Sequence, residues 1–266
     1  MRKELKMKIK DIISLLEKQG EWVNRRKTRD HLLFGNMERD IDRMIVCWVA
    51  TNDIIQQAIL EDCHFIICHE NPFYLNSTQM HTSIIEATKE KQHILKKHDI
   101  SIYRCHDLWD LYPEYGVLDS WAKTLDLPLE KSKQSGFYRY FENINMTTKD
   151  LALHIKDCIQ EHGEVGIEVI GDLNKTIHTL AIGTGAITDV FEMCDLNADA
   201  CLVSDDGINN WIATQWCMDH HIPLIVVNHR TAENAGMMGM KEYLKKIYPD
   251  IDIKVMLNQY KIYHLS

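Results

Sequence analysis

Short apolar runs alternate with amphipathic segments along this chain, and the alternation predicts its architecture. Continuous apolar runs predict buried strands, and they lie at 44–49, 64–68, 100–105, 167–170, 176–182, 200–203 and 224–227. Apolar residues at helical spacing predict helices, and they lie at 11–18, 53–60, 82–97, 120–125, 150–162, 188 onward, 211–218 and 237–247. Such an order is typical of an α/β fold, with mainly parallel sheets flanked by helices.

A short internal repeat in the sequence suggests the domain organisation. Asp53 stands fifteen residues before Cys68, and Asp189 stands fifteen residues before Ser204. This register aligns His69-Glu70 with Asp205-Asp206. We therefore expect two related α/β halves with the metal site between them, forming one compact unit: residues 1–130, a polar linker or crossover at 131–149, and residues 150–266. The runs on either side of residues 171–174 predict a hairpin.

Composition excludes several classes of protein. With 45% hydrophobic and 26% charged residues, the 266-residue chain is typical of a globular protein. No apolar run approaches the length of a membrane span, and the N-terminus alternates charged with apolar residues, unlike a signal peptide. Eight cysteines occur singly without a C-x-x-C motif, which suits a reducing compartment. The net charge of −9 argues against a nucleic-acid surface. We expect a cytoplasmic protein without a membrane partner.

Polar side chains that bind metals follow four of the predicted strands. Ligands of open α/β sheets bind at the carboxyl ends of strands. The residues at these ends are His69 and Glu70; His106, Asp107 and Asp110; Ser204, Asp205 and Asp206; and Asn228, His229 and Glu233. Histidine with carboxylates is a ligand set for zinc, manganese or iron. Because gathered carboxylates repel one another unless a cation neutralises them, we expect the histidines and acids to converge in one cleft around metal.

Each pair alone also fits an ordinary role. His69-Glu70 fits a solvated loop pair, Asp110 a polar loop residue, and His229 with Glu233 an ion pair at a helix start. The segment Gly183-Thr184-Gly185 is similar to a phosphate cradle, but it lacks the full glycine pattern and a P-loop lysine.

The order of the motifs resembles the Nif-three-like family, a group of dinuclear-metal proteins often described as GTP cyclohydrolase I type 2 homologues. The resemblance covers nearly the whole chain. The matching segments are residues 30–35 (Asp-x-x-x-x-Gly), 69–73 (His-His-Pro-aliphatic-Phe), 106–110 (His-x-x-x-Asp), 116–119 (Gly-Val-Asn-Asp) and 228–233 (Gly-His-x-x-x-Glu). The last motif is the most specific of these.

The resemblance implies a ligand set and also shows two departures. It makes His69, Asp110, His229 and Glu233 metal ligands, with Asp110 and Glu233 shared between two ions. Glu70 stands where the family has a second histidine, so it either ligates through a hard oxygen or hydrogen-bonds the loop around Asn71. The segment 204–211 lacks the histidine that the family carries there.

The function expected from these residues is metal-dependent hydrolysis. Two divalent ions (zinc, manganese or iron) roughly 3.5–4 Å apart activate a water and stabilise a displaced oxygen. His106, Asp205 and Asp206 are candidates for proton handling or for orienting ligands. The expected substrate is a small nucleotide-like or phosphorylated compound. Two alternatives stay open, a non-catalytic metal-binding or metal-trafficking protein and a regulatory interaction protein. The resemblance also implies a homo-oligomer, in the family often a hexameric ring.

Overall fold

The apolar runs form the central strands of two separate sheets, each in its own part of the chain. The computed structural model describes residues 7–74, 81–208, 210–257 and 262–263. The chain divides into unit 1, Met1–Tyr115 with Met237–Asn258, and unit 2, Gly116–Gly236 with Gln259–Ser266. The chain thus returns to unit 1 after completing most of unit 2. Among the described residues, each helix is too short or too polar to cross a bilayer.

Unit 1 is built on a five-stranded sheet. The strands of the whole unit, including two outside this sheet, are β1 (Met7–Lys8), β2 (His31–Phe34), β3 (Asp40–Ile41), β4 (Arg43–Val49), β5 (Phe65–Glu70), β6 (Ser101–Arg104) and β13 (Asp252–Met256). Its helices are α1 (Ile9–Glu17), α2 (Asn52–Leu60), α3 (Thr82–Lys97), α4 (Asp107–Asp110) and the C-terminal part of α9 (His229–Ile247). The strand order is β13-β4-β5-β6-β2, while β1 and β3 pair separately. All neighbours in the large sheet are parallel except β2, which is antiparallel to β6.

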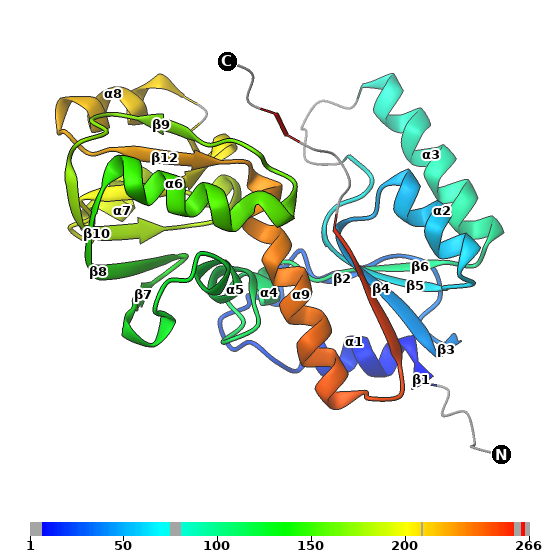
Figure 1. Cartoon of the computed structure of the whole chain (residues 1–266). Coiled ribbons are helices and arrows are strands. Elements are labelled where there is room, and N and C mark those ends of the chain that lie inside the picture. The colour runs from blue at the N-terminus through cyan, green and yellow to red at the C-terminus, as the bar shows by residue number, and fades with distance from the viewer. Residues whose placement is uncertain (1–6, 75–80, 209, 258–261, 264–266) are drawn as a thin grey trace. The chain divides into compact units, whose positions relative to one another are not determined.

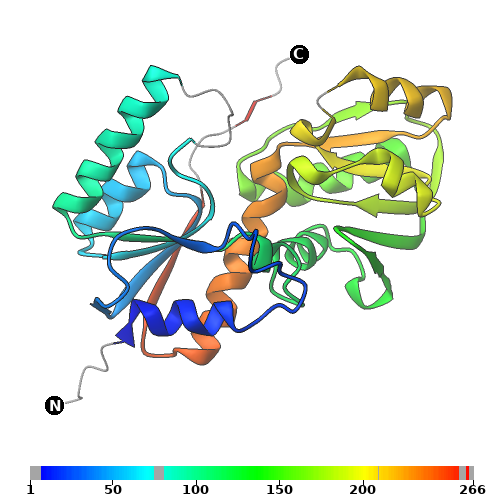
Figure 2. The same cartoon turned by 180° about the vertical axis from the view of Figure 1, so that it is seen from behind.

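Helices cover both faces of this sheet (Figure 1). α2 and α3 pack on the face that carries Cys47, Ile66 and Ile102. α1 lies on the opposite face, as Figure 2 also shows, and its buried residues Ile9, Ile12, Ile13 and Leu16 have helical spacing. Because β5 is covered on both faces, its sequence is a continuous apolar run rather than an alternating one.

Unit 2 is built on a six-stranded mixed sheet. Its strands are β7 (Lys133–Ser135), β8 (Tyr138–Thr147), β9 (Glu168–Ile170), β10 (Thr176–Ile182), β11 (Ala200–Ser204) and β12 (Leu224–Val227). Its α-helices are α5 (Val117–Thr124), α6 (Thr148–Ile159), α7 (Val190–Asp195), α8 (Trp211–Asp219) and the start of α9. Its 3-10 helices are η1 (Leu129–Lys131), η2 (Gln160–His162), η3 (Gly185–Ile187) and η4 (Asp205–Ile208).

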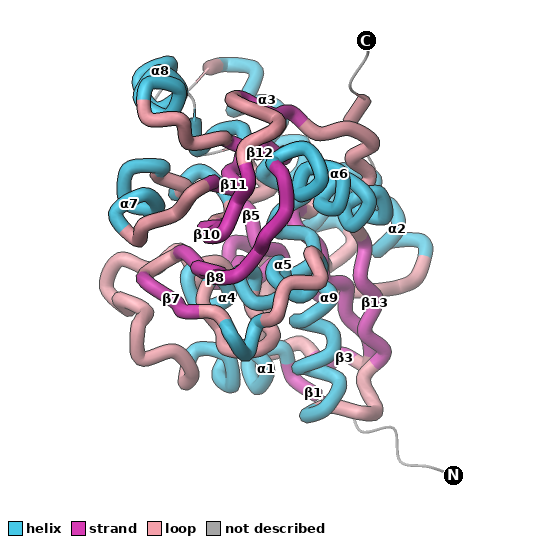
Figure 3. Tube along the Cα trace, turned by 60° about the vertical axis from the view of Figure 1, so that its left-hand side comes forward, coloured by secondary structure: helices cyan, strands magenta, loops and turns pink. Residues whose placement is uncertain are grey.

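The strand order of unit 2 is β7-β8-β10-β11-β12-β9. β10, β11 and β12 are parallel, and β8 and β9 run antiparallel to their neighbours. α6 covers one face of the sheet, and α7 and α8 cover the other (Figures 1 and 3). Side chains cap two of its helices, since Asp189 accepts the Phe191 N–H at 2.8 Å at the start of α7 and Thr147 accepts the Asp150 N–H at 3.1 Å at the start of α6.

Four strands of each sheet share one arrangement, which supports the expected relation between the halves. In unit 1, β4, β5 and β6 are parallel in chain order, and the earlier strand β2 lies antiparallel beside β6. In unit 2, β10, β11 and β12 are parallel in chain order, and the earlier strand β9 lies antiparallel beside β12. β5 and β11 therefore hold equivalent places, as the sequence register suggested.

Three expectations about the chain's organisation differ from the structure. The runs around residues 171–174 are not a hairpin, because β8 and β11 occupy both edges of β10 and β9 pairs with the open edge of β12. Residues 131–149, expected to be a linker or crossover, contain β7 and β8. The division of the chain falls after Tyr115, and β13 joins the sheet of unit 1 beside β4.

A buried lysine holds the carboxyl ends of two strands of unit 1. Lys91 on α3 is 3% exposed, and its ammonium group donates to the Pro72 carbonyl at 2.7 Å and to the Ala50 carbonyl at 3.3 Å. Ala50 follows β4 and Pro72 follows β5. The lysine lies 4.5 Å from the centre of the Tyr74 ring as well. Lys91 therefore ties α3 to the turn that follows His69 and Glu70.

We expect Lys91→Met to lower the free energy of unfolding by about 1–3 kcal/mol, because two carbonyl groups lose their buried donor. Urea denaturation followed by circular dichroism measures the change. Lys89→Met on the exposed side of α3 is the matched control. Equal denaturation midpoints for the two variants would contradict this role of Lys91.

Candidate metal centre

His69 and Glu70 are the last two residues of β5, at the carboxyl end of a parallel strand. The His69 ring is fully buried, and its Nδ1 lies 3.2 Å from the Cys105 carbonyl oxygen. Its Nε2 lies 3.3 Å from Asp110 Oδ1. The strand pairing of β5 with β6 brings Cys105 to this position, so the backbone itself sets the orientation of the ring.

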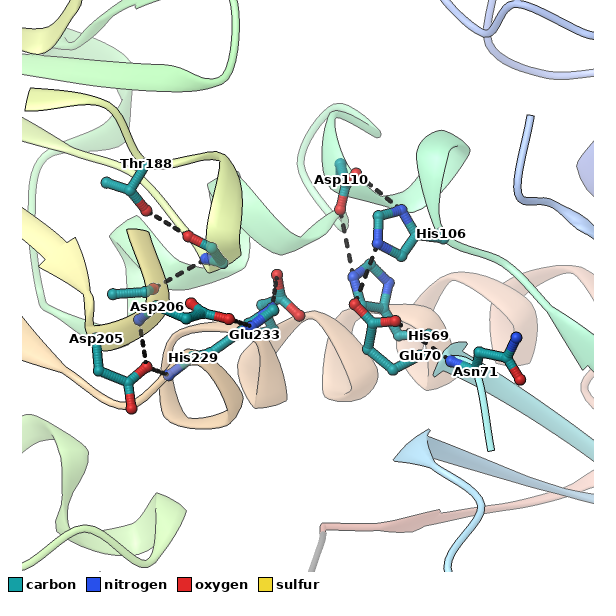
Figure 4. Close-up of polar contacts among 12 residues, drawn as sticks. His69, Glu70, Asn71, His106, Asp110, Thr188, Asp205, Asp206, His229 and Glu233 are labelled. Atoms are coloured by element: carbon teal, nitrogen blue, oxygen red, sulfur yellow. Dashed lines mark hydrogen bonds and ion pairs between the residues drawn. The ribbon is translucent and has the colours of Figure 1, made fainter. Parts of the chain in front are cut away.

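His106 and Asp110 are placed by a short helix that follows β6. The Asp30 carboxylate accepts the His106 N–H at 2.5 Å and the Leu108 N–H at 3.0 Å, which caps α4. The helical turn puts Asp110 Oδ2 3.2 Å from His106 Nδ1, because side chains four residues apart lie on one face of a helical turn. The His106 ring stacks on His69 with centres 4.4 Å apart. Figure 4 shows these rings with Asp110.

Glu70 is held by three groups of unit 1. Its Oε2 accepts from Arg104 Nη2 at 2.6 Å and from the Asn71 N–H at 3.3 Å. Its Oε1 lies 3.3 Å from His106 Nε2. Arg104 is buried on the adjacent strand β6 and also donates to the His69 carbonyl at 3.0 Å. One oxygen of Glu70 therefore meets the Asn71 loop, as one of the two alternatives expected, and the other faces His106. That Glu70 ligates a metal ion stays a prediction.

The electrostatics of this cluster favour positive charge at His106. Burial opposes the charged ring, but Asp110, Asp107 and Glu70 outweigh it and raise the pKa of His106 to about 12. Burial also opposes ionisation of Asp110, yet His106 and His69 lower the pKa of its carboxyl. The charged groups here are three carboxylates and one guanidinium, those of Glu70, Asp107, Asp110 and Arg104. When the histidines are neutral, these groups sum to two negative charges, which attract a cation.

A second cluster lies in unit 2, where β12 leads into α9. His229 begins α9, and its Nε2 lies 2.9 Å from Glu233 Oε1, one turn later. Its Nδ1 lies 2.7 Å from Asp206 Oδ2, as drawn in Figure 4. Asp205 accepts the His229 N–H at 3.0 Å and an amide N–H of Asn228 at 2.7 Å. The two aspartates therefore fix both the ring and the backbone of His229.

Charge in this second cluster follows the same pattern. Burial of the His229 ring opposes its protonation, but Glu233 and Asp206 outweigh that effect and raise the pKa of His229 to about 11. The ring thus lies in a strongly anionic setting made by residues of unit 2.

Gly185 leaves space beside this pair that another residue would fill. It has φ +67, and a Cβ there would lie 2.5 Å from Glu233 Oε1 and 2.8 Å from His229 Nε2. Its N–H donates to Ser204 Oγ at 2.9 Å, and its carbonyl accepts from the Thr188 hydroxyl at 2.5 Å (Figure 4). The glycine segment compared with a phosphate cradle therefore approaches the histidine–carboxylate pair.

The two clusters occupy equivalent positions in the repeated topology. His106 stands two residues after β6 with Asp110 four residues later, and His229 stands two residues after β12 with Glu233 four residues later. The sequence shows this second correspondence as the common spacing His-x-x-x-acid.

The donor chemistry of the clusters fits a divalent metal ion. In unit 1, single ligand atoms of His69, Glu70 and His106 lie within 4.8 Å of one another, as do those of His106, Asp107 and Asp110. Nitrogen and carboxylate oxygen are the donors that zinc, manganese and iron accept. In each unit a histidine has its Nδ1 beside a fixed oxygen and its Nε2 toward a carboxylate, which is the orientation typical of metal-ligating imidazoles.

The structure therefore brings the predicted residues together as two sets. His69, Glu70, His106 and Asp110 form the set of unit 1, and Asp205, Asp206, His229 and Glu233 form the set of unit 2. That both sets meet in one cleft stays a prediction. Sequence analysis missed the roles of Asp30, Arg104 and Gly185. Two of these had a signal, since Asp30 begins the Asp-x-x-x-x-Gly segment and Gly185 belongs to the glycine segment 183–185.

Comparisons with known proteins agree with the motif order. A family model described as Duf34/NIF3 (NGG1p interacting factor 3) matches residues 7–262. A protein of Clostridium acetobutylicum named GTP cyclohydrolase 1 type 2 homolog is 23% identical over 254 residues, 91% of either chain. A Clostridium perfringens protein of the same name is 26% identical over 210 residues, covering 75% of this chain and 78% of that protein.

Solved structures share the fold. A Bacillus cereus protein related to NIF3 has a TM-score of 0.77 at 14% identity, covering 98% of this chain and 99% of that chain. Reduced HcgD from Methanocaldococcus jannaschii has a TM-score of 0.71 at 19% identity, covering 96% of this chain and 99% of that chain. At these identities the likeness concerns the fold, and it confirms the predicted α/β class.

We expect Gly185→Ala to weaken metal binding by about 10- to 100-fold, because the new methyl group displaces His229 and Glu233 from their positions. Calorimetric titration of the metal-free protein with zinc measures the affinity. Gly136→Ala is the matched control, since it has φ +55 with nothing within 4 Å of its Cβ position. Both substitutions carry a similar backbone penalty of about 1–2 kcal/mol. Equal zinc affinities for the two variants would contradict the proximity argument.

Proposed function

This chain belongs to the Duf34/NIF3 (NGG1p interacting factor 3) family, and on that basis we propose that it binds two divalent metal ions and hydrolyses a small nucleotide-like or phosphorylated compound. The observation that supports metal binding best is the orientation of two histidines, one buried (His69) and one partly buried (His229). His69 Nδ1 lies beside the Cys105 carbonyl and His229 Nδ1 beside Asp206, so each Nε2 is directed at a carboxylate. A cation at each place satisfies nitrogen and oxygen together.

The charge of the clusters supports the same proposal. Glu70, Asp107 and Asp110 lie within one small region of unit 1, and Arg104 supplies a permanent positive charge beside Glu70. In unit 2, Asp206 and Glu233 lie on the two sides of the His229 ring. Protonated histidines balance these acids, and divalent ions replace those protons when they bind.

The residues of the chain have distinct parts in the proposed hydrolysis. When bound, the ions supply Lewis acidity, which lowers the pKa of a water and stabilises developing negative charge. Asp206 orients the His229 ring, and Asp205 holds the backbone of His229. His106 holds a proton between Asp107 and Glu70, and we propose it as the group that delivers a proton to a leaving oxygen.

The proposed substrate class comes from the relatives. Two curated relatives carry the name GTP cyclohydrolase 1 type 2 homolog, which indicates a nucleotide-like small molecule. A cytoplasmic location and a homo-oligomer, in the family often a hexameric ring, also stay predictions.

A second function is favoured by two observations. Arg104 neutralises Glu70 without a metal, and Trp211 is 75% exposed in the region where the family carries a histidine. Both features fit a non-catalytic metal-binding or interaction protein on the same scaffold. Metal analysis followed by a panel of nucleotides and phosphoesters separates the two functions. Metal-dependent turnover supports hydrolysis, bound metal without turnover supports the second function, and absence of bound metal overturns both metal-based proposals.

We expect Asp110→Ala and Glu233→Ala each to remove both ions and the hydrolytic activity, because the resemblance assigns each carboxylate to both ions. Metal content by mass spectrometry and turnover with the best panel substrate are the measurements. Asp53→Ala, exposed on α2, and Glu242→Ala, exposed on α9, are the controls. Retention of two ions at unchanged affinity in either site variant would disprove the shared roles.

Replacing Glu70 with histidine tests whether this residue is itself a ligand. We expect Glu70→His to raise the preference for zinc over manganese by about tenfold, because a borderline nitrogen replaces a hard oxygen. Competition titrations of the two metals on both proteins give the ratio. An unchanged ratio would mean that Glu70 stays on Arg104 and does not bind the metal.

A further inference from the structure

Three cysteines that are separate in the sequence meet on one face of the unit 2 sheet. Cys194 lies on α7, Cys201 on β11 and Cys217 on α8, and all three belong to the contacts around one apolar core. The Cys194 and Cys201 sulfurs are 3.9 Å apart. Cys201 and Cys217 are fully buried, whereas Cys194 is partly exposed. The fold therefore presents one accessible thiol with two buried thiols behind it.

The surroundings of Cys194 differ from those of the other cysteines. Hydrogen bonds from Cys201 and Cys217 outweigh burial and lower the pKa of the Cys194 thiol. Positive charge from His220 and Lys175 acts in the same direction. Cys158, the other partly exposed cysteine of unit 2, lies 3.8 Å from His154 Nε2, and burial, with Asp126 and Asp157, raises the pKa of its thiol. Because the thiolate is the reactive form, Cys194 is the more reactive of the two.

We propose that Cys194 is a peroxide-sensitive thiol whose oxidation ends in a disulfide with Cys201. The pairing follows from the short distance between these sulfurs and from the partial exposure of Cys194. A metal ion explains the cluster less well, because the groups of described residues with metal-compatible spacing do not include these cysteines.

The oxidant is a hydroperoxide, and the reaction has two steps. In the first, the Cys194 thiolate attacks a peroxide oxygen, so that a sulfur–oxygen bond forms, the oxygen–oxygen bond breaks, and the departing oxygen takes up a proton. Cys194 loses two electrons and becomes a sulfenic acid, while the peroxide is reduced. In the second, the Cys201 sulfur attacks the Cys194 sulfur, the sulfur–oxygen bond breaks, and hydroxide leaves as water with the Cys201 proton.

Closing the bond requires a small local movement. The two sulfurs of a disulfide lie about 2 Å apart. The Cys194 and Cys201 sulfurs, now 3.9 Å apart, must therefore approach each other by about 2 Å. Cys194 lies one residue before the end of α7, where helical hydrogen bonding ends and a side chain can turn at low cost. Cys201 lies in the middle of the sheet and keeps its place.

The test uses the full chain treated with hydrogen peroxide and then alkylated, digested and analysed by mass spectrometry. We expect a peptide pair joined through Cys194 and Cys201, and its loss on treatment with a reductant. In Cys201→Ser we expect Cys194 to remain as a sulfenic acid that dimedone traps. Without peroxide, iodoacetamide at pH 7 should modify Cys194 at least about tenfold faster than Cys158.

Cys158→Ser is the control variant, and it should form the disulfide as the unchanged protein does. The alkylation comparison uses the unchanged protein, so it does not depend on whether a variant folds. Equal alkylation rates for Cys194 and Cys158, or a peroxide product that joins Cys194 to Cys217, would overturn the proposal.

Discussion

Parallel strand pairing is the constraint on which the candidate site depends. Because neighbouring parallel strands end at the same edge of a sheet, residues that follow β5 and β6 must lie close together. The pairing explains why His69 reaches the carbonyl of Cys105, which is 36 positions away in the chain. β11 and β12 do the same for Ser204, Asp205 and His229 in unit 2.

The repeated topology makes the two clusters variations of one arrangement. In each unit, the third parallel strand leads into a helix that carries a histidine and, one turn later, an acid. The units differ in what holds the histidine. Asp30, from a distant loop, caps the helix that carries His106, whereas Asp205 and Asp206, from the adjacent strand end, hold His229. The same strand arrangement thus places a histidine and an acid in each unit, but different residues hold the histidine in the two units.

Charge balance distinguishes unit 1 most clearly from the family pattern. Glu70 adds a carboxylate where the family has an imidazole, and Arg104 on the adjacent strand supplies a matching positive charge. A buried carboxylate without such a partner would be costly. The substitution at residue 70 is therefore compatible with the fold because residue 104 is an arginine, a dependence that neither residue shows alone.

The sequence by itself determined the local elements and the identity of most candidate ligands. Apolar runs predicted the strands, apolar residues at helical spacing predicted most of the helices, and polar residues after strand ends identified His69, Asp110 and His229, because these features depend on neighbours within a turn or a strand. Only the tertiary structure decided that β9 lies beside β12, that Arg104 neutralises Glu70, that Gly185 approaches His229, and that three scattered cysteines meet. The physical reason is that strand order brings together residues that are far apart in the chain, and no local pattern specifies which edges pair.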